Sequence, residues 1–400
     1  MSEHVENHHD EPLVAMGKYK SVAMLVGLVG AIILIAGLLT QGKVAWQGYL
    51  FGWLVWSSMS LGCLGLILLK HTVNGKWGLP VIRLLEAGAS FTNFVILFVA
   101  FLPILFSVLR GDMLIYEWAN AEKLHADHVL HMKAWWLNQV GFALRAVLYF
   151  VIWMFMAAGL RASTLRQDKS KDDKERALRT NWSAPGLVIF ALTITLAFTD
   201  WVMSLEPYWS STIYGAWWMV GMSLMAFAFV TMIATLNKKR EPYTSPVSTS
   251  WTRDMGNLML AFTMLWGYTS LSQYLIIWSG NLPEFITYYV NRSKGGWNAV
   301  GMAVLFGQFF IPFFCLLSPR VKAQAPLLAK LCGWILVFRV IDMYYVIAPA
   351  TQTSPIPNPW AIFSVVGLGG LWFYGFAKSV AMAPLMPSYD PRLQEAAHAH

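Results

Sequence analysis

Residues 47–69 read QGYLFGWLVWSSMSLGCLGLILL, an apolar stretch without a charged side chain. A helix needs about 20 apolar residues to cross the hydrocarbon core of a bilayer, which is about 30 Å thick. The stretch is long enough, and it lacks the alternation of apolar and polar residues that is typical of a transmembrane strand. It therefore predicts a membrane-spanning helix.

Nine further stretches of the 400-residue chain fit the same description. Hydrophobic residues make up 57% of the chain and charged residues 12%, against about 25% charged residues in soluble domains. We therefore predict an all-α integral membrane protein with about ten transmembrane helices between 20 and 382, with cytoplasmic tails at 1–19 and 383–400. The predicted spans are roughly 20–40, 47–69, 79–108, 134–160, 184–204, 211–236, 255–278, 297–317, 326–348 and 359–382.

The distribution of Lys and Arg predicts the orientation. Of the 29 basic residues, 18 lie in the two tails and the even-numbered connections when Lys20, at the start of the first span, is counted with the tail, whereas 6 lie in the odd-numbered connections. Basic residues accumulate on the cytoplasmic side, so we expect both tails there, together with the charged run 161–179 as a solvated loop. The first nineteen residues lack the basic start of a cleavable signal, so we expect the first span to be retained.

A weak internal repeat predicts the helix arrangement. The turn after the fifth span, SLEPYWSSTIYGAWW at 204–218, has a counterpart after the seventh, WSGNLPEFITYYV at 278–290. Both turns fall outside, which favours two similar four-helix bundles, spans 2–5 and 6–9, with spans 1 and 10 peripheral. These turns are rich in aromatics and poor in charge, so we expect them, with the long loop 109–133, to dock an extracytoplasmic partner.

The histidines and cysteines argue against a bound redox group. All nine histidines fall in predicted polar stretches, so no predicted span offers a pair of axial haem ligands. The three cysteines are isolated, which excludes a cysteine-ligated iron–sulfur cluster, a zinc site and a covalent haem. His125, His128 and His131 have a helical spacing that suits a metal, but we favour a polar loop with ordinary histidines. The cysteines are Cys63, Cys315 and Cys332.

Ionisable side chains inside a bilayer cost about 2.5–3.5 kcal/mol each and are candidates for function. We expect Glu86 to lie near the cytoplasmic surface, and Asp200 and Asp342 to lie toward the outer surface. Arg145 and Arg339 are expected near the centre. The candidates inside the spans are Arg83 and Glu86 in the third, Arg145 in the fourth, Asp200 in the fifth, and Arg339 and Asp342 in the ninth. The two residues of the third span are three positions apart, as are the two of the ninth. Glu206 follows the fifth span.

Three interpretations of these residues remain open. The three arginines and three acids balance, so they could form buried ion pairs that fix helix packing. Alternatively, Glu86, Asp200, Glu206 and Asp342 form a proton path, with polar bridges from Tyr268, Gln273 and nearby hydroxyls. A small-molecule site is the third interpretation, in which a quinone head group would contact Asn93, Asn138 or Gln139.

Two motifs resemble a known family. The run DWVMSLEPYWSSTIYG at 200–215 resembles the signature of the ActF family, membrane subunits of alternative complex III, a bacterial quinol:cytochrome c oxidoreductase. The run SQYLIIWSGNLPE at 272–284 is similar to a motif shared by ActF and its paralogue ActC. ActF and ActC are both similar to the membrane subunit of polysulfide reductase, the NrfD family. The resemblance of this sequence to ActF extends along the whole chain.

The resemblance implies a multi-pass subunit of the bacterial inner membrane that pairs with the quinol-binding subunit ActC. Menaquinol or ubiquinol, haem c and iron–sulfur clusters would belong to partner subunits, including periplasmic ones. This chain would bind no cofactor. It would either conduct protons or serve as a structural anchor. A self-contained secondary transporter is the competing class, although Pro103 and Pro312 do not occupy equivalent positions in two repeats.

Overall fold

The computed structural model describes residues 11–387 and 390, and this part of the chain forms helices and no strand. Most of the predicted tails, at 1–10 and 391–400, lie outside the described residues, although the first helix already begins at Glu11. The long helices are α1 (Glu11–Thr40), α2 (Lys43–Val73), α4 (Phe91–Leu109), α7 (Gln139–Ser170), α8 (Lys174–Trp201), α9 (Tyr214–Leu236), α10 (Thr249–Gly280), α15 (Ala325–Ile347) and α16 (Pro359–Val380).

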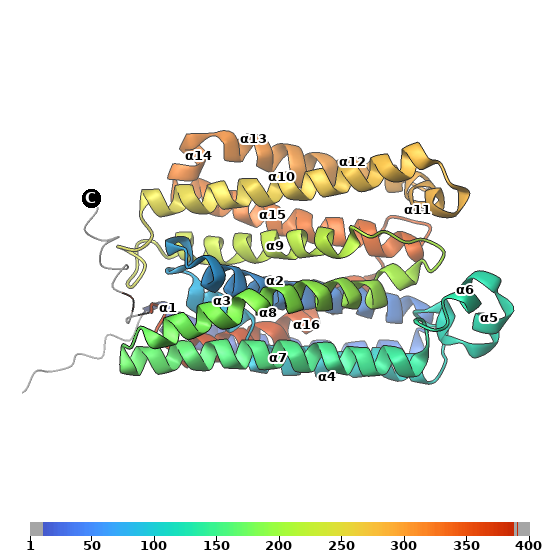
Figure 1. Cartoon of the computed structure of the whole chain (residues 1–400), viewed down its shortest axis with the longest axis horizontal. Helices are drawn as coiled ribbons and strands as arrows, with labels where there is room; N and C mark the ends of the chain where they lie inside the picture. The colour runs from blue at the N-terminus through green and yellow to red at the C-terminus, as the bar shows by residue number, and fades with distance from the viewer. Residues whose placement is uncertain (1–10, 388–389, 391–400) are drawn as a thin grey trace, which may run out of the picture.

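Shorter helices lie at the two ends of the long ones or interrupt them. Figure 1 shows α1 beginning and α16 finishing at one end, called here the terminal end, where α14 also lies. The opposite end, called here the far end, carries α5, α6 and α11. The short helices are α3 (Ile82–Gly88), α5 (Ala121–Ala126), α6 (His128–Met132), α11 (Pro283–Ser293), α12 (Trp297–Val304), α13 (Ile311–Leu317) and α14 (Pro319–Ala323).

The chain is a multi-pass helical membrane protein. Within the described residues, nine helical segments are long and apolar enough to cross a membrane, and they match nine of the ten predicted spans. The predicted seventh span lies in α10, which runs beside the others over a similar length (Figure 1). Polar side chains between Tyr268 and Gln273 lower its hydropathy.

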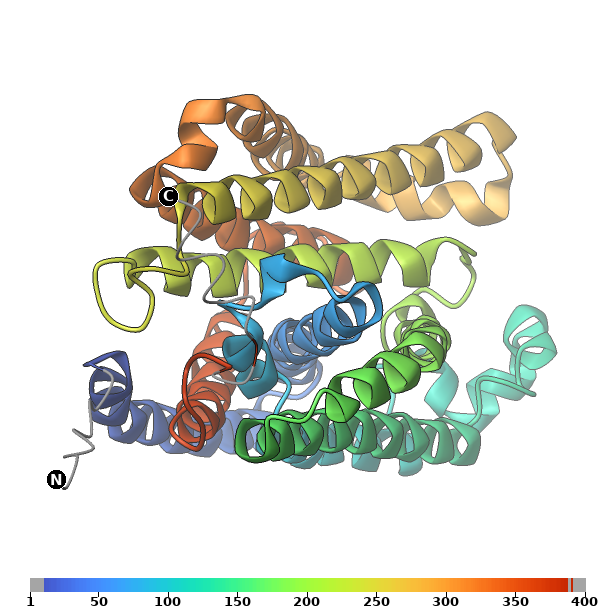
Figure 2. The same ribbon diagram turned by 60° about the vertical axis from the view of Figure 1, so that its left-hand side comes forward.

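Helix α2 is the centre of the molecule. Its span is buried almost throughout, and it packs against α4, α8, α9 and α16 (Figure 2). Helix α1, by contrast, is largely exposed and packs mainly on α16. The two backbones approach so closely that a Cβ on Gly30 would lie 2.3 Å from the Cα of Gly367. Small residues permit this kind of contact between membrane helices.

The third predicted span, 79–108, is broken rather than continuous. Helix α3 ends at Gly88, and α4 starts after Ser90, whose side chain accepts a hydrogen bond from the backbone nitrogen of Asn93. The Asn93 amide in turn donates to the carbonyls of Ala87, at 3.3 Å, and Gly88, at 3.2 Å. These bonds satisfy backbone groups that a break inside a membrane would otherwise leave unpaired.

One prediction about the terminal end is wrong, and it concerns the charged run between α7 and α8. The run 161–179, predicted as a solvated loop, is mostly helical, because α7 continues to Ser170 and α8 begins at Lys174. Arg179 is buried between these helices and donates to Ser163, at 3.2 Å, and to Gln167. Since polar side chains pair across the two helices, both extend beyond their apolar stretches.

The prediction that no span holds a histidine is also wrong. Helix α2 runs on to Val73, and His71 is buried within its span. The backbone oxygen of His71 accepts a hydrogen bond from Thr180 Oγ1 of α8, at 3.1 Å, which binds this last turn to the bundle. The other histidines of the described part lie in α5 and α6 at the far end.

Candidate functional site

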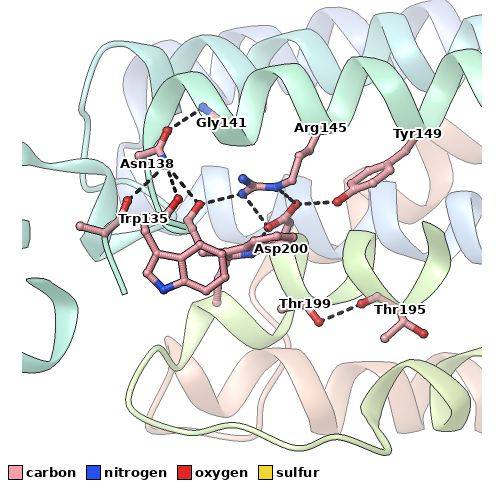
Figure 3. Close-up of polar contacts among 11 residues, drawn as sticks. Trp135, Asn138, Gly141, Arg145, Tyr149, Thr195, Thr199 and Asp200 are labelled. Carbon is pink, nitrogen blue, oxygen red and sulfur yellow. Dashed lines mark hydrogen bonds and ion pairs between the residues drawn. The ribbon is translucent and has the colours of Figure 1, made fainter. Parts of the chain in front are cut away.

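Asp200 forms the most completely bonded charge cluster. Arg145 Nε donates to Asp200 Oδ2, and Arg145 Nη2 to Asp200 Oδ1, both at 2.9 Å (Figure 3). Tyr149 donates to Oδ2 at 3.1 Å, and Trp136 Nε1 donates to Oδ1 at 2.8 Å. Each carboxylate oxygen therefore has two donors, and the Arg145 guanidinium also lies 4.1 Å from the centre of the Trp136 ring.

The position of Arg145 follows from where α7 begins. The predicted span 134–160 put Arg145 near its centre, but the helix starts at Gln139, after Asn138 caps it. Arg145 consequently lies in the second turn of α7, level with Asp200 in the last turn of α8. Next to Asp200, Trp201 is fully buried among the rings of Trp53, Phe101 and other aromatics.

Arg339 and Asp342 form a second pair, in α15. They are three residues apart, almost fully buried, and hydrogen-bonded to each other. The guanidinium fills the space left by Gly221 of α9, where a Cβ would lie 2.3 Å from Arg339 Nη2. A glycine on the neighbouring helix therefore makes room for the buried cation.

A third cluster lies at the terminal end. Arg83 Nη1 donates to Glu86 Oε2 at 2.8 Å and to Thr164 Oγ1 at 3.0 Å, and Arg83 also pairs with Asp168. Arg161 donates to the Glu86 carbonyl, at 3.2 Å. Asp168 belongs to the segment that the sequence placed in a loop, so its role as a partner was missed.

Glu206 belongs to a fourth pair that the sequence did not predict. Its Oε1 lies 2.9 Å from Nη2 of Arg292, a buried residue of α11. The same guanidinium stacks 3.4 Å from the centre of the Tyr288 ring and donates to the Val346 carbonyl at 2.6 Å. The spacing of four between Tyr288 and Arg292, which puts both on one helix face, was the available signal.

Gln273 joins the two motifs that carry the family resemblance. Its Oε1 accepts from Ser211 Oγ at 2.9 Å, and its amide lies 3.5 Å from the Tyr289 hydroxyl. Nearby, Trp209 stacks on Tyr288 with ring centres 4.0 Å apart. The segments 200–215 and 272–284 thus meet at the far end through side-chain contacts.

The helices α5 and α6 are attached to the same region. Tyr208 donates to Asp127 Oδ2 at 2.7 Å, and Lys133 donates to the Pro207 carbonyl. The bond from Tyr208 lowers the pKa of Asp127, and the Asp127 carboxylate raises the pKa of Tyr208 to about 12. We call α5, α6, the turn 202–213 and α11 together the far-end platform.

The Arg83–Glu86 cluster and the Asp200 cluster lie at opposite ends of the long helices. At 1.5 Å per residue, Arg179 and Asp200 are roughly 30 Å apart along α8. That distance equals the thickness of the hydrocarbon core, about 30 Å. Asp342 lies five residues before the end of α15, near the far end. The carboxylates therefore do not contact one another across the bilayer.

Several predicted site residues lie apart from these clusters. Tyr268 is 66% exposed on the outer face of α10. Asn138 caps α7 by accepting from the Gly141 nitrogen at 2.7 Å, and Gln139 donates to the Ala119 carbonyl at 2.7 Å. Asn93 bridges the α3–α4 break. Each of these amides thus has a bonding partner in the backbone.

The described residues include no group of three or more His, Cys, Asp or Glu side chains that could hold a metal ion. His125 and His131 do approach each other, with their Nδ1 atoms 3.3 Å apart on the exposed surface of α5 and α6. His128 lies on the same short helix as His131.

Comparison with known proteins leaves the family open. No protein-family model matches the chain, and no curated protein sequence matches it significantly. The geometry of the site is consequently the main basis for a functional proposal.

Proposed function

We propose that this chain is a non-redox membrane subunit of a quinol:acceptor oxidoreductase, and that its far-end platform docks the redox-active partners. The observation that carries the proposal is the meeting of segments 200–215 and 272–284 at Ser211 and Gln273. These are the two stretches whose sequence resembles ActF. In the proposed complex the chain lies in a bacterial inner membrane, with the platform in the periplasm and both tails in the cytoplasm.

The platform has the properties of a docking surface. It is fixed by the Glu206–Arg292 pair and by the Tyr208–Asp127 hydrogen bond. Around it, Trp135 is 78% exposed and Trp278 is 62% exposed. Rigid aromatic side chains with little conformational entropy to lose are favoured at protein interfaces. The expected partners are periplasmic multihaem cytochrome c and iron–sulfur subunits, with the paralogue ActC beside this chain in the membrane.

The arrangement of helices supports a scaffold. We propose ten spans, with α10 as the seventh, in two four-helix groups. Helices α2, α4, α7 and α8 pack in one group, and α9, α10, α12–α13 and α15 pack in the other. Helix α9 also contacts α2 and α8, which joins the groups. Contacts between helices thus link the two groups into one scaffold.

The ion pairs favour an anchoring role for Asp200. Its carboxylate accepts four hydrogen bonds, two of them from an arginine, so both of its oxygens are already bound to side chains that hold α7 against α8. Proton transfer is the second candidate function, and Asp342 is the residue that favours it. Asp342 is buried and bonded to Arg339 of its own helix, a less complete set of donors than that of Asp200.

A photo-cross-linking amino acid at Trp135 tests the docking surface. The matched control is the same substitution at Leu236, which is 67% exposed at the terminal end of α9. In membranes we expect position 135 to cross-link to a haem-bearing polypeptide and position 236 not to do so. Cross-links to haem proteins from position 236 alone, or from neither position, would contradict the proposal.

A further inference from the structure

His125 of α5 and His131 of α6 bring two ring nitrogens together at the far end. Their Nδ1 atoms are 3.3 Å apart, and both side chains are exposed to solvent. The rings do not stack, since their centres are 5.4 Å apart and their planes are inclined by 53°. The two residues therefore meet through ring nitrogens, which are metal ligands when the imidazole is neutral.

The backbone that carries the two histidines is fixed. Asp127, which lies between them, accepts hydrogen bonds from the nitrogens of Val129, at 2.9 Å, and Leu130, at 3.2 Å. It also accepts one from Tyr208, at 2.7 Å, which attaches the segment to the turn 202–213. The side chains of Leu124 and Leu130 are buried. Because the scaffold already holds the pair in place, little conformational entropy is lost when it binds a ligand.

The separation of the two nitrogens matches the geometry of a tetrahedral metal ion. Zinc–nitrogen bonds are about 2.0–2.1 Å long, so two nitrogens at the tetrahedral angle are roughly 3.3–3.4 Å apart. The Nδ1 atoms of His125 and His131 have this separation. A hydrogen bond between the rings also fits 3.3 Å, so zinc binding decides between the two interpretations.

We propose that His125 and His131 bind a divalent ion of the zinc type through their Nδ1 atoms. The sequence alone favoured ordinary loop histidines, because helical spacing did not show how close the two rings come. Among the described residues, no third His, Cys, Asp or Glu side chain joins the pair. The ion therefore keeps two positions for ligands from outside the chain, and an open position on zinc takes water or an incoming ligand.

The open positions lie on the far-end platform, and their role in docking rests on the proposed function. A periplasmic partner that contributes a His or a carboxylate completes the tetrahedron, so that zinc joins the two proteins. A ligand that binds the complex and not the separated chains favours the complex by mass action. Zinc should therefore strengthen docking at the platform.

Calorimetric titration of the full-length chain in detergent with zinc tests the pair. The tails carry five further histidines, and a background variant replaces them by Gln. In that background, His125→Gln and His131→Gln should each weaken zinc binding about tenfold or more, since even a lost supporting hydrogen bond costs about 10–100-fold. His128→Gln is the matched control, because His128 is exposed on the same short helix as His131. The replaced tail residues are His4, His8, His9, His398 and His400.

Hydrogen exchange gives a second readout that does not depend on affinity. Zinc held by both histidines joins α5 to α6, so it should raise the protection of the Val129 and Leu130 amides in the first turn of α6. The increase should be present in the background variant and in His128→Gln, and absent in His125→Gln. All three histidines are exposed, so none of these substitutions removes a buried contact.

Two results would overturn the zinc site. The first is a background variant that binds no zinc, or that binds it no more tightly than His125→Gln. The second is an equal loss of affinity in His128→Gln, which would place the ion elsewhere on α5 and α6.

The docking step has a separate test, the photo-cross-link from position 135. A zinc chelator should reduce cross-linking to the haem-bearing polypeptide. Cross-linking that the chelator leaves unchanged would refute the zinc bridge while the docking role stands. Absence of cross-links even with zinc would refute the docking role, whereas zinc binding by the separate chain would still establish the site.

Discussion

Asp200 and Arg145 show at the scale of single residues how a charge is retained inside this protein. Removing one partner of a buried pair leaves the other unpaired and costs about 3–5 kcal/mol, whereas replacing both by apolar residues is often neutral. The Asp200 oxygens are satisfied by Arg145, Tyr149 and Trp136. The pair therefore belongs with the packing of α7 against α8.

Asp200→Asn should lower the thermal stability of the purified protein, because it leaves Arg145 without its counter-ion. The double variant Arg145→Met/Asp200→Leu should recover most of that loss. Thermal unfolding of the two variants in detergent measures the difference. If Asp200→Asn is as stable as the wild type while proton release by the complex in sealed vesicles falls, Asp200 exchanges protons and the packing role is refuted.

The bond between Asp127 and Tyr208 gives a second residue-scale prediction, on pH. A lowered Asp127 pKa adds stability above the ordinary value of 3.8, and this is lost as pH falls through the lower folded value. A raised Tyr208 pKa adds stability below 10.0, and this is lost as pH rises through about 12. The attachment of α5 and α6 should thus be constant from about pH 5 to about pH 9.

Hydrogen-exchange protection of the Val129 and Leu130 amides, which donate to Asp127, measures this attachment. Tyr208→Phe should reduce the protection equally across the whole pH window. A step in protection between about pH 5 and about pH 9 would contradict this prediction.

At the scale of helices, the packing of α9 against α15 depends on one glycine. Ala is normally more favourable than Gly inside a helix by about 0.8–1.0 kcal/mol. At Gly221, however, the added Cβ would collide with the buried Arg339 guanidinium, whereas at Gly333 it would make an ordinary contact of 3.8 Å with Met232. Gly221→Ala should therefore destabilise the protein, and Gly333→Ala should stabilise it slightly.

Thermal melts of these two variants separate the effects. Destabilisation by Gly221→Ala should disappear when Arg339 and Asp342 are both replaced by Leu, because the collision is then removed. Equal stabilisation by both glycine variants would mean that Arg339 does not occupy the space beside Gly221.

Sequence hydropathy predicted nine of the spans, because each buries its backbone bonds internally and presents apolar side chains. It did not predict the helical ends. The Arg179 side chain and the backbone oxygen of His71 find hydrogen-bond partners on neighbouring helices, at Ser163 and Thr180, and such partners are distant in sequence. The break at Ser90 was missed although its partner is local, because the side chain of Asn93 rather than a turn signal satisfies its backbone groups.

The sequence predicted those ion pairs of the candidate site whose two residues lie on one helix. The i,i+3 spacings placed Arg83 with Glu86 and Arg339 with Asp342 on shared helix faces, and both pairs are in contact. The pair Arg145–Asp200 joins two helices and the pair Glu206–Arg292 joins the turn 202–213 to α11, so local spacing could not identify them. Tyr268 was predicted to be a polar bridge because of its hydroxyl group, but it lies on the exposed face of α10.

At the scale of the whole molecule, the arrangement of clusters predicts a membrane orientation. Lys174 begins α8 at the terminal end, and Asp127 lies between α5 and α6 at the far end (Figure 1). A reporter fused at Lys174 should report the cytoplasm, and one near Asp127 the periplasm, because basic residues concentrate in the connections at the terminal end. The reverse result at either site would contradict the proposed orientation.

Purification of the intact chain through an affinity tag, in a gentle detergent, tests the central claim most directly. The measurement is the visible spectrum and quinol:cytochrome c activity of the purified material, before and after this chain is separated from its partners. We predict haem absorption and activity in the complex, and no visible absorption from the separated chain. A chain that purifies alone, or that retains haem after complete separation, would contradict the proposed role.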